Sequence, residues 1–159
     1  MDLQNRGMTE ENLSTYRSLP IALLRARERV MGPIRAMLSD VGITEQQWRV
    51  LRVLRETGPT DPTHIADQAC LLLPSLTRIL QKLDDKKLIR RQQDKSDRRK
   101  QIVQITPKGE ALIKANLATS IALLEQIRDQ MGPERYDALL DLLNELDRSE
   151  IAAITPDQP

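Results

Sequence analysis

Hydrophobic residues recur every three or four positions through most of the chain, which is the spacing of one helix face and predicts a mainly helical protein. The first helix is expected at about residues 20–42, and its apolar positions are Leu23, Val30, Ile34 and Leu38. Arg27 falls inside this apolar stripe. A guanidinium among apolar side chains needs an anionic partner to offset its lost hydration, so Arg27 is a residue to account for.

The second helix has a well-marked beginning. Thr44 is expected to cap the backbone amide of Gln47, and the Gln47 side chain is expected to reach back to Thr44 in a capping box. Ile43, just before the cap, is expected to pack on Trp48 as a hydrophobic staple. The helix should run to about Glu56, because a Gly-Pro pair follows soon after.

Two short helices should come next. Asp61 suits the N-cap of the third helix and Pro62 its first turn, and the inward residues of that helix are Ile65, Ala66 and Ala69. Pro74 suits the first turn of the fourth helix. Its inward residues are Leu76, Ile79, Leu80 and Leu83, and its outward residues are Ser75, Arg78, Gln81, Lys82 and Asp85.

After Leu88 the hydrophobic period changes from helical to strand-like. Residues 88–93 (LIRRQQ) and 101–105 (QIVQI) are predicted to form two short strands, joined by the charged connection 94–100 (DKSDRRK). Two short helices followed by such a hairpin are the arrangement of a winged helix-turn-helix, in which the hairpin is the wing.

Two longer helices complete the prediction. Thr106 and Pro107 form another N-cap and first-turn pair, opening a helix with the apolar residues Leu112, Ile121, Leu124 and Ile127. Gly132 and Pro133 separate it from a last helix that carries Tyr136, Leu139, Leu140, Leu143 and Leu146. The predicted fold class is therefore mainly α, with about six helices and a small β-hairpin wing.

A single domain should account for residues 1–159, because the chain is too short for two ordinary domains. The winged helix-turn-helix core is expected at about 44–105. The flanking helices, at about 20–42 and 107–152, carry long apolar stripes that this small core cannot cover alone. We expect these flanking helices to form the interface of a two-fold homodimer.

Positive charge is concentrated in one segment, although the whole chain carries only +1. Residues 74–100 contain ten Lys and Arg against four Asp and Glu, a net charge of +6. From residue 107 onward five basic residues stand against ten acidic ones, a net charge of −5. A basic segment that coincides with a helix and a hairpin is the electrostatic pattern expected of a DNA-binding surface, although a solvated helix face can also be basic.

The candidate DNA-binding residues lie at two places in this segment. Ser75, Thr77 and Arg78 lie at the beginning of the fourth helix, the end that enters a major groove first, although Thr77 can also face sideways. Lys82, one turn later, is expected to meet the DNA backbone. The hairpin tip adds Arg98, Arg99 and Lys100, whose mutual repulsion Asp94, Asp97 or a polyanion can offset. The alternative interpretations are that the helix residues are ordinary exposed side chains and that the hairpin tip is a solvated charged turn.

The segment IADQACLLLPSLTRILQKLDDKKLIRRQQDKSDRRKQIVQITPKGEAL resembles the core of the multiple-antibiotic-resistance regulator (MarR) family. The resemblance includes an Asp-x-Arg wing motif at Asp97 and Arg99 and the Thr-Pro-Lys-Gly at 106–109. The segments IALLRARERVMGPIRAML and ITEQQWRVLRVL resemble the regulators of homoprotocatechuate (4-hydroxyphenylacetate) degradation within that family. The resemblance implies a homodimer held by its N- and C-terminal helices. It also implies that the homodimer binds a palindromic DNA operator and represses transcription there. A small phenolic or aromatic acid would then release the protein from the operator.

An aromatic acid would require a cation and an apolar wall, and Arg27 and Trp48 supply these. A guanidinium holds a carboxylate through two parallel hydrogen bonds, and an indole packs against a ring. These residues are therefore the candidate effector-binding pair. The structural alternative pairs Arg27 with an acid from another helix or from the partner subunit, and places Trp48 in the core.

The composition opposes an enzyme. A single cysteine and a single histidine exclude an internal disulfide and a Cys/His metal cluster within one chain, although carboxylate-only metal sites stay open. The sequence also lacks a phosphate-binding loop and a paired nucleophile and base, so no catalytic residue, metal or cofactor is predicted, although a dispersed carboxylate site stays open. His64 is expected on a partly exposed helix face without a catalytic role.

Two other functions stay open beside a ligand-responsive repressor. Cys70 makes an oxidant-sensing regulator one alternative, although we expect a buried, unreactive thiol there. A protein-interaction module that has kept the fold without binding DNA is the other. The N-terminal segment lacks the basic start and apolar stretch of a secretory signal, and no apolar run reaches the ~18 residues of a membrane span. A soluble, cytoplasmic protein without a membrane partner is expected.

Overall fold

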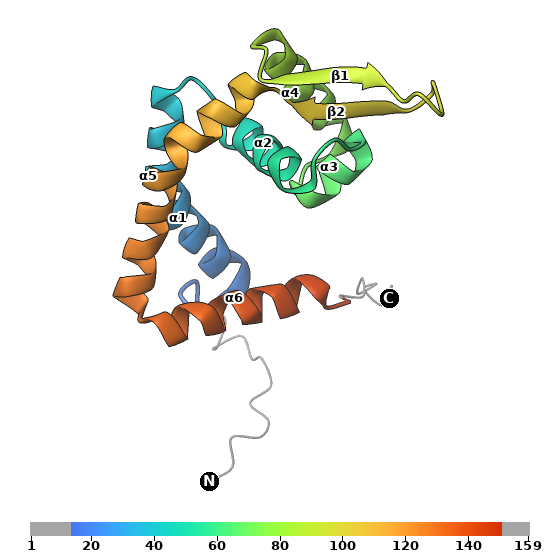
Figure 1. Ribbon diagram of the computed structural model, residues 1–159. Helices are drawn as coiled ribbons and strands as arrows, with labels where there is room; N and C mark the ends of the chain where they lie inside the picture. The colour runs from blue at the N-terminus through green and yellow to red at the C-terminus, as the bar shows by residue number, and fades with distance from the viewer. Residues whose placement is uncertain (1–13, 151–159) are drawn as a thin grey trace, which may run out of the picture. The chain divides into compact units, whose positions relative to one another are not determined.

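The computed structural model describes residues 14–150 and contains six helices and one β-hairpin in that range (Figure 1). In chain order they are α1 (Leu19–Asp40), α2 (Glu45–Thr57), α3 (Pro62–Gln68), α4 (Leu73–Asp85), β1 (Ile89–Gln93), β2 (Gln101–Ile105), α5 (Pro107–Met131) and α6 (Pro133–Arg148). The predicted helices and hairpin are thereby confirmed. The segment considered for a secretory signal, up to residue 13, and the predicted helix end at 152 lie outside the described residues.

Three helices begin where the local sequence predicts. At the start of α2, the hydroxyl of Thr44 accepts the amide N–H of Gln47 (3.2 Å) and the Gln47 side chain accepts that of Thr44 (3.1 Å). This is the predicted capping box. Asp61 caps α3 by accepting the amide N–H of His64 (3.0 Å), and the Thr106 hydroxyl caps α5 (3.2 Å). Each cap satisfies a backbone donor that the helix itself leaves without a partner.

The end of α3 corrects one expectation, because the Cys70 thiol is exposed and not buried. Cys70 follows the helix in the left-handed region (φ 51°), with its amide bonded to the Asp67 carbonyl (3.1 Å) and the next amide, of Leu71, bonded to the Ala66 carbonyl (2.8 Å). This pair of bonds is a Schellman motif. The buried positions are Ala66 in the helix and Ala69 at its C-cap, and the residue that turns the chain after them stays at the surface.

The hydrophobic core lies around α2, whose Val50, Leu51 and Leu54 are completely buried. The neighbouring elements contribute the buried residues Ile65 of α3, Leu76, Leu80 and Leu83 of α4, Ile89 of β1, Val103 of β2 and Ile113 of α5. The predicted inward leucines of α4 are thus confirmed. Figure 1 shows α2, α3 and α4 gathered beside the base of the hairpin, which places α4 next to β1.

The flanking helices are less buried than their apolar stripes suggest. In α1 only Ile34 and Leu38 are buried, whereas Leu23 is exposed. No residue of α6 is buried, and Leu139, Leu140 and Leu143 are exposed there. Burial requires a covering surface as well as an apolar side chain, and within the described chain these positions are left uncovered.

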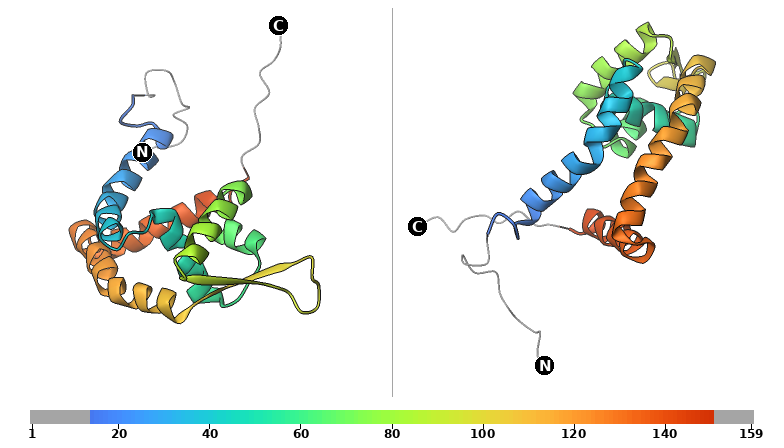
Figure 2. Two further views of the ribbon diagram at one scale, coloured as in Figure 1. Left: turned by 90° about the horizontal axis from the view of Figure 1, so that it is seen from above. Right: turned by 90° about the vertical axis from the view of Figure 1, so that its left-hand side faces the viewer.

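The hairpin pairs antiparallel, with Ile89 opposite Ile105 and Gln93 opposite Gln101. Thr60, in the loop before α3, forms two backbone hydrogen bonds with Val103 of β2 (3.0 and 2.8 Å) and so attaches the hairpin to the helices. Beyond this attachment the hairpin extends away from α3 and α4 (Figure 2). The tip is therefore presented at a distance from the core.

The chain divides into two compact units, one up to Ile121 and one from Ala122 onward. The first contains α1 to α4, the hairpin and the beginning of α5, and the second contains the end of α5 and all of α6. Among the described residues no helix combines the length and apolar character required to cross a membrane.

Candidate nucleic-acid interface

The helix α4 presents a polar face opposite its three buried leucines. Ser75, Arg78 and Lys82 are exposed on this face, three or four residues apart as the helical repeat requires. Within residues 14–150, none of these three side chains has an ion pair or a hydrogen bond. Two cations and a hydroxyl are therefore available to an external partner.

Thr77 lies on a different side of α4 from Ser75 and Lys82. Its hydroxyl donates to the Leu73 carbonyl one turn earlier (3.3 Å). With Arg99 and Lys100 it lines an open hollow of about 550 Å³ between α4, the start of α3 and the hairpin. Thr77 thus faces the wing, together with two of the predicted hairpin residues.

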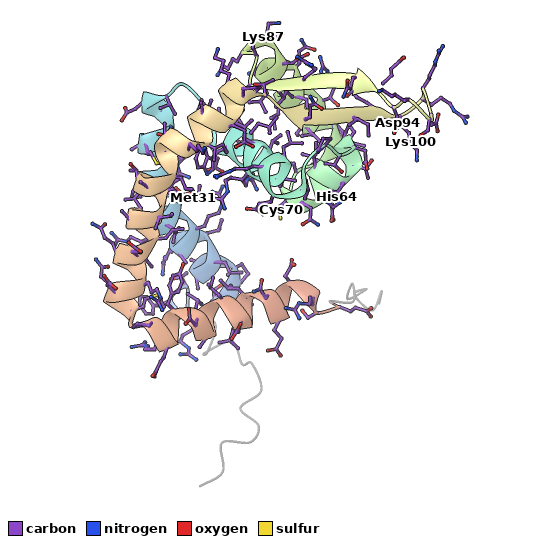
Figure 3. The ribbon with its side chains drawn as sticks, viewed as in Figure 1. Met31, His64, Cys70, Lys87, Asp94 and Lys100 are labelled. Carbon is purple, nitrogen blue, oxygen red and sulfur yellow. The ribbon has the colours of Figure 1, made fainter. Side chains whose placement is uncertain are left out.

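A carboxylate folds the hairpin tip. Asp94 accepts the backbone N–H groups of Ser96 (2.6 Å) and Asp97 (3.1 Å) and the Ser96 hydroxyl, and its own N–H donates to the Lys100 carbonyl (2.9 Å). The Ser96 hydroxyl, more than the backbone amides, lowers the pKa of Asp94 below its usual range. Figure 3 shows Asp94 and Lys100 together at the far end of the hairpin.

The three basic residues of the tip project into solvent. Arg98 and Lys100 are exposed, and the side chain of Arg99 is 93% exposed. Asp97 accepts from the Arg99 backbone N–H (3.0 Å) and forms a loose ion pair with its guanidinium (3.4 Å). A pair this exposed holds Arg99 only weakly, so its charge remains available to a polyanion.

Sequence reasoning missed a connection between the hairpin and α4. Arg91 of β1 forms an ion pair with Asp84 (Nε to Oδ2, 3.2 Å) and donates a second hydrogen bond from Nη2 to Gln81 (2.6 Å). Gln81 in turn donates to Asp85 (2.8 Å). The sequence signal is only an acid and an arginine seven residues apart across a helix-to-strand junction, and it identifies the pair only once the strand is known to fold back along the helix.

Arg27 has an acidic partner from another helix of the same chain. Its side chain is half exposed and forms ion pairs with Glu28 and with Glu45 of α2, whose side chain is only 10% exposed. Arg35 also binds Glu45 (3.2 Å) and Glu28, and these carboxylates, that of Glu28 first, raise the pKa of Arg35. The nearly buried Glu45 carboxylate is thus held between two guanidiniums that join α1 to α2.

Trp48 is 6% exposed and belongs to the core. Beside the α1–α2 turn is an open hollow of about 530 Å³, lined by Arg35 and Glu45 with residues of the turn and not by Arg27 or Trp48. The structure therefore does not gather Arg27 and Trp48 around that hollow.

His64 lies at an exposed position of α3.

The chain is similar in sequence and in structure to known transcriptional regulators. The MarR family model matches residues 43–100. The chain is 37% identical over 139 residues to the HTH-type transcriptional regulator FarR of Neisseria gonorrhoeae, covering 87% of this chain and 95% of that protein. It is 38% identical over 128 residues to the homoprotocatechuate degradative operon repressor of Escherichia coli, covering 80% and 86%.

Two solved structures of similar proteins contain a bound partner. NadR in complex with 4-hydroxyphenylacetate matches with a TM-score of 0.73 at 37% identity, covering 82% of this chain and 96% of that one. The transcriptional repressor CouR, bound to a 23-mer DNA duplex, matches with a TM-score of 0.73 at 28% identity, covering 89% and 99%. The predicted winged-helix fold is thereby confirmed.

Proposed function

The chain belongs to the MarR family, and from this premise we propose that it represses an aromatic-acid catabolic operon until a small phenolic or aromatic acid relieves the repression. The coarser function, a DNA-binding transcriptional regulator and not an enzyme, follows from the family itself. The finer proposal draws on two relatives, one that represses a homoprotocatechuate operon and one that binds 4-hydroxyphenylacetate.

One observation carries the DNA-binding role: two separate elements present unpaired or weakly paired cations next to each other. The helix α4 offers Arg78 and Lys82, and the hairpin beside it offers the Arg98–Lys100 tip. We propose that α4 enters the major groove, where Ser75, Thr77 and Arg78 meet base edges or phosphates and Lys82 meets the backbone. The tip, with Arg98, Arg99 and Lys100, then reaches the adjacent minor groove.

The proposed assembly is a homodimer on a palindromic operator in the cytoplasm. Its winged core is residues 44–105, and its dimer helices are about 20–42 and 107–152. A two-fold dimer places its two recognition helices on half-sites roughly one helical turn, ~34 Å, apart. The exposed leucines of α1 and α6 support this division of the chain.

Salt-dependent binding to a palindromic duplex tests the proposal. The duplex is recovered from a random-sequence pool by selection with the full-length protein. Affinity for it should fall steeply as salt rises and should exceed affinity for a scrambled duplex by about a thousandfold or more. Equal affinity for both duplexes would reduce the protein to a non-specific binder, and no binding would leave the interaction module as the better function.

Arg99→Ala and Arg78→Ala should have different effects. Arg99→Ala should weaken binding to all duplexes and lower the slope of log affinity against log salt by about one per wing, because it removes a phosphate or groove charge. If Arg78 reads a base, its removal should cost ~1–3 kcal/mol and relax preference at one operator position. Gel-shift titrations with single-base operator variants distinguish the two.

The matched control is Lys114→Ala, which removes an exposed charge from α5. It should leave affinity and salt slope nearly unchanged. An Arg99→Ala protein that behaved like this control would show that the hairpin tip makes no DNA contact.

We propose Arg27 and Trp48 as the effector-binding pair, with a hydroxyphenylacetate-type acid as effector. Arg27 supplies a guanidinium that is half exposed, and its present partners are the carboxylates of Glu28 and Glu45. A ligand carboxylate would compete for the same hydrogen-bond donors. The ligand releases DNA only to the extent that it binds the DNA-free arrangement better than the DNA-bound one.

Arg27→Ala should therefore make operator binding insensitive to the acid while leaving DNA binding intact. Calorimetry with 4-hydroxyphenylacetate and with homoprotocatechuate, beside operator titrations, measures both effects. Arg29→Ala, an exposed arginine of the same helix, is the control and should keep the wild-type response. Unchanged ligand binding by Arg27→Ala would assign this arginine to the ion pairs with Glu28 and Glu45 alone.

Oxidant sensing through Cys70 is the second candidate, because the thiol is exposed. An exposed thiol is accessible to peroxide, whereas a buried one is not. Operator binding that does not respond to hydrogen peroxide would remove this candidate.

A further inference from the structure

Arg91 is placed where the hairpin and α4 meet. It lies on β1 opposite Val103, the same residue of β2 that Thr60 ties to the helices through backbone hydrogen bonds. The Arg91 side chain is only 22% exposed and points its guanidinium at α4. One level of the hairpin is thus attached to the helices from both of its strands.

Beyond this level the hairpin lines a hollow with α3 and α4, but no side-chain hydrogen bond or ion pair joins it to them in the described residues. In the described structure, the side-chain hydrogen bonds and ion pairs of residues 92–101 all stay within the hairpin: Gln92 with Gln104, and Asp94 and Asp97 with residues of the tip. A two-stranded hairpin has little stability of its own. The direction in which the tip projects is therefore set mainly at the level of Arg91.

The Arg91 guanidinium makes two contacts at once on α4. Nε binds Asp84 and Nη2 binds Gln81, and these two residues are three positions apart on one side of the helix. A planar guanidinium with donors in a fixed fork matches two such acceptors, whereas a lysine ammonium acts as a single flexible point charge. The pair of contacts fixes the angle of β1 on α4 as well as its distance.

We propose that Arg91 is a positioning residue, which directs the basic hairpin tip so that the tip and α4 engage one DNA site together. The proposal rests on the proposed DNA-binding function. It makes the contribution of Arg99 to binding depend on the Arg91 contacts with Asp84 and Gln81.

A double-mutant cycle tests this dependence. Affinity for the selected palindromic duplex is measured for wild type, Arg91→Ala, Arg99→Ala and the double variant. Without its attachment the tip no longer meets the DNA in a fixed place, so Arg99→Ala should weaken binding roughly fivefold less in the Arg91→Ala protein than in wild type. A side chain that only added stability would leave the Arg99 effect unchanged in the folded protein.

Arg90→Ala provides the matched control. Arg90 is the preceding residue of the same strand, carries the same charge and is exposed, and it has no ion pair in the described chain. The loss of affinity caused by Arg90→Ala should simply add to the loss caused by Arg99→Ala, with no coupling between the two. Comparable coupling for Arg90 and Arg91 would mean that the cycle detects general electrostatics, and this would overturn the proposal.

Asp84→Asn separates positioning from charge. It raises the net charge of the protein by one, so electrostatics alone predicts tighter DNA binding, whereas loss of the Arg91 partner predicts a smaller Arg99 effect. With lysine in place of Arg91, the effect of Arg99→Ala should lie between its values in wild type and in the Arg91→Ala protein. A full Arg99 effect in both Asp84→Asn and Arg91→Ala would refute the inference while leaving the DNA-binding function standing. No selective DNA binding by wild type would refute both.

Discussion

A protein that lacks residues 133–159 should be monomeric and should bind the operator roughly a thousandfold more weakly than the full chain, because the two half-site contacts would no longer be linked. The reason lies in α6. None of its residues is buried, and Leu139, Leu140, Leu142 and Leu143 are exposed along it. Such an apolar surface is unfavourable in water and is expected to be covered by a second copy.

Sedimentation and operator titration measure the two effects. Truncation after Glu150 removes the end of the chain but keeps α6, and it should leave both dimer and affinity unchanged. Leu140→Glu with Leu143→Glu keeps the full length while placing charges on the apolar face, and it should reproduce the loss. A shortened protein that remains dimeric and binds normally would move the dimer interface away from α6.

Gly109→Ala should destabilise the fold by about 3 kcal/mol through overpacking. A Cβ at Gly109 would overlap the Leu88 carbonyl oxygen and would lie 2.7 Å from Cγ1 of Ile105. The Leu88 carbonyl cannot simply move aside, because it accepts the Thr106 amide (3.0 Å). The Thr106 hydroxyl is likewise bonded to the neighbouring Lys87 carbonyl (2.7 Å), which holds the start of α5 against the beginning of β1.

Urea denaturation at a fixed protein concentration measures the loss of stability. Gly32→Ala is the control, because Gly32 lies inside α1 and a Cβ there meets no atom within 4 Å. Alanine in a helix interior is favoured over glycine by up to about 1 kcal/mol, so this control should be slightly stabilising. A Gly109→Ala protein as stable as the wild type would exclude the close contact at Gly109.

The structure thus gives a physical reason for glycine at the last position of the Thr-Pro-Lys-Gly motif, which the neighbouring sequence did not reveal. The family resemblance singled out residues 106–109, but only the fold shows that Gly109 lies against a backbone carbonyl of the preceding strand junction. Residue preference at this point arises from the space available and not from the backbone conformation, since Gly109 lies in ordinary helical geometry.

The local features of the chain were predictable from the sequence because they depend on neighbours in the sequence. The capping box of Thr44 and Gln47 and the caps at Asp61 and Thr106 join residues three positions apart, so their side-chain chemistry determines where helices start. The leucines of α4 and the basic segment 74–100 that contains them were also predictable, because periodicity and charge are properties of the chain itself.

The remaining features were decided by the tertiary structure. Glu45 meets Arg27, and Asp84 meets Arg91, only because two elements pack side by side, and pairings across elements are not encoded in any local pattern. Cys70 is exposed because the chain turns at the end of α3 and leaves it outside the core. Sequence therefore determined the elements and their chemistry, whereas packing determined which side chains are paired, covered or left available, since burial and long-range contact depend on what lies opposite.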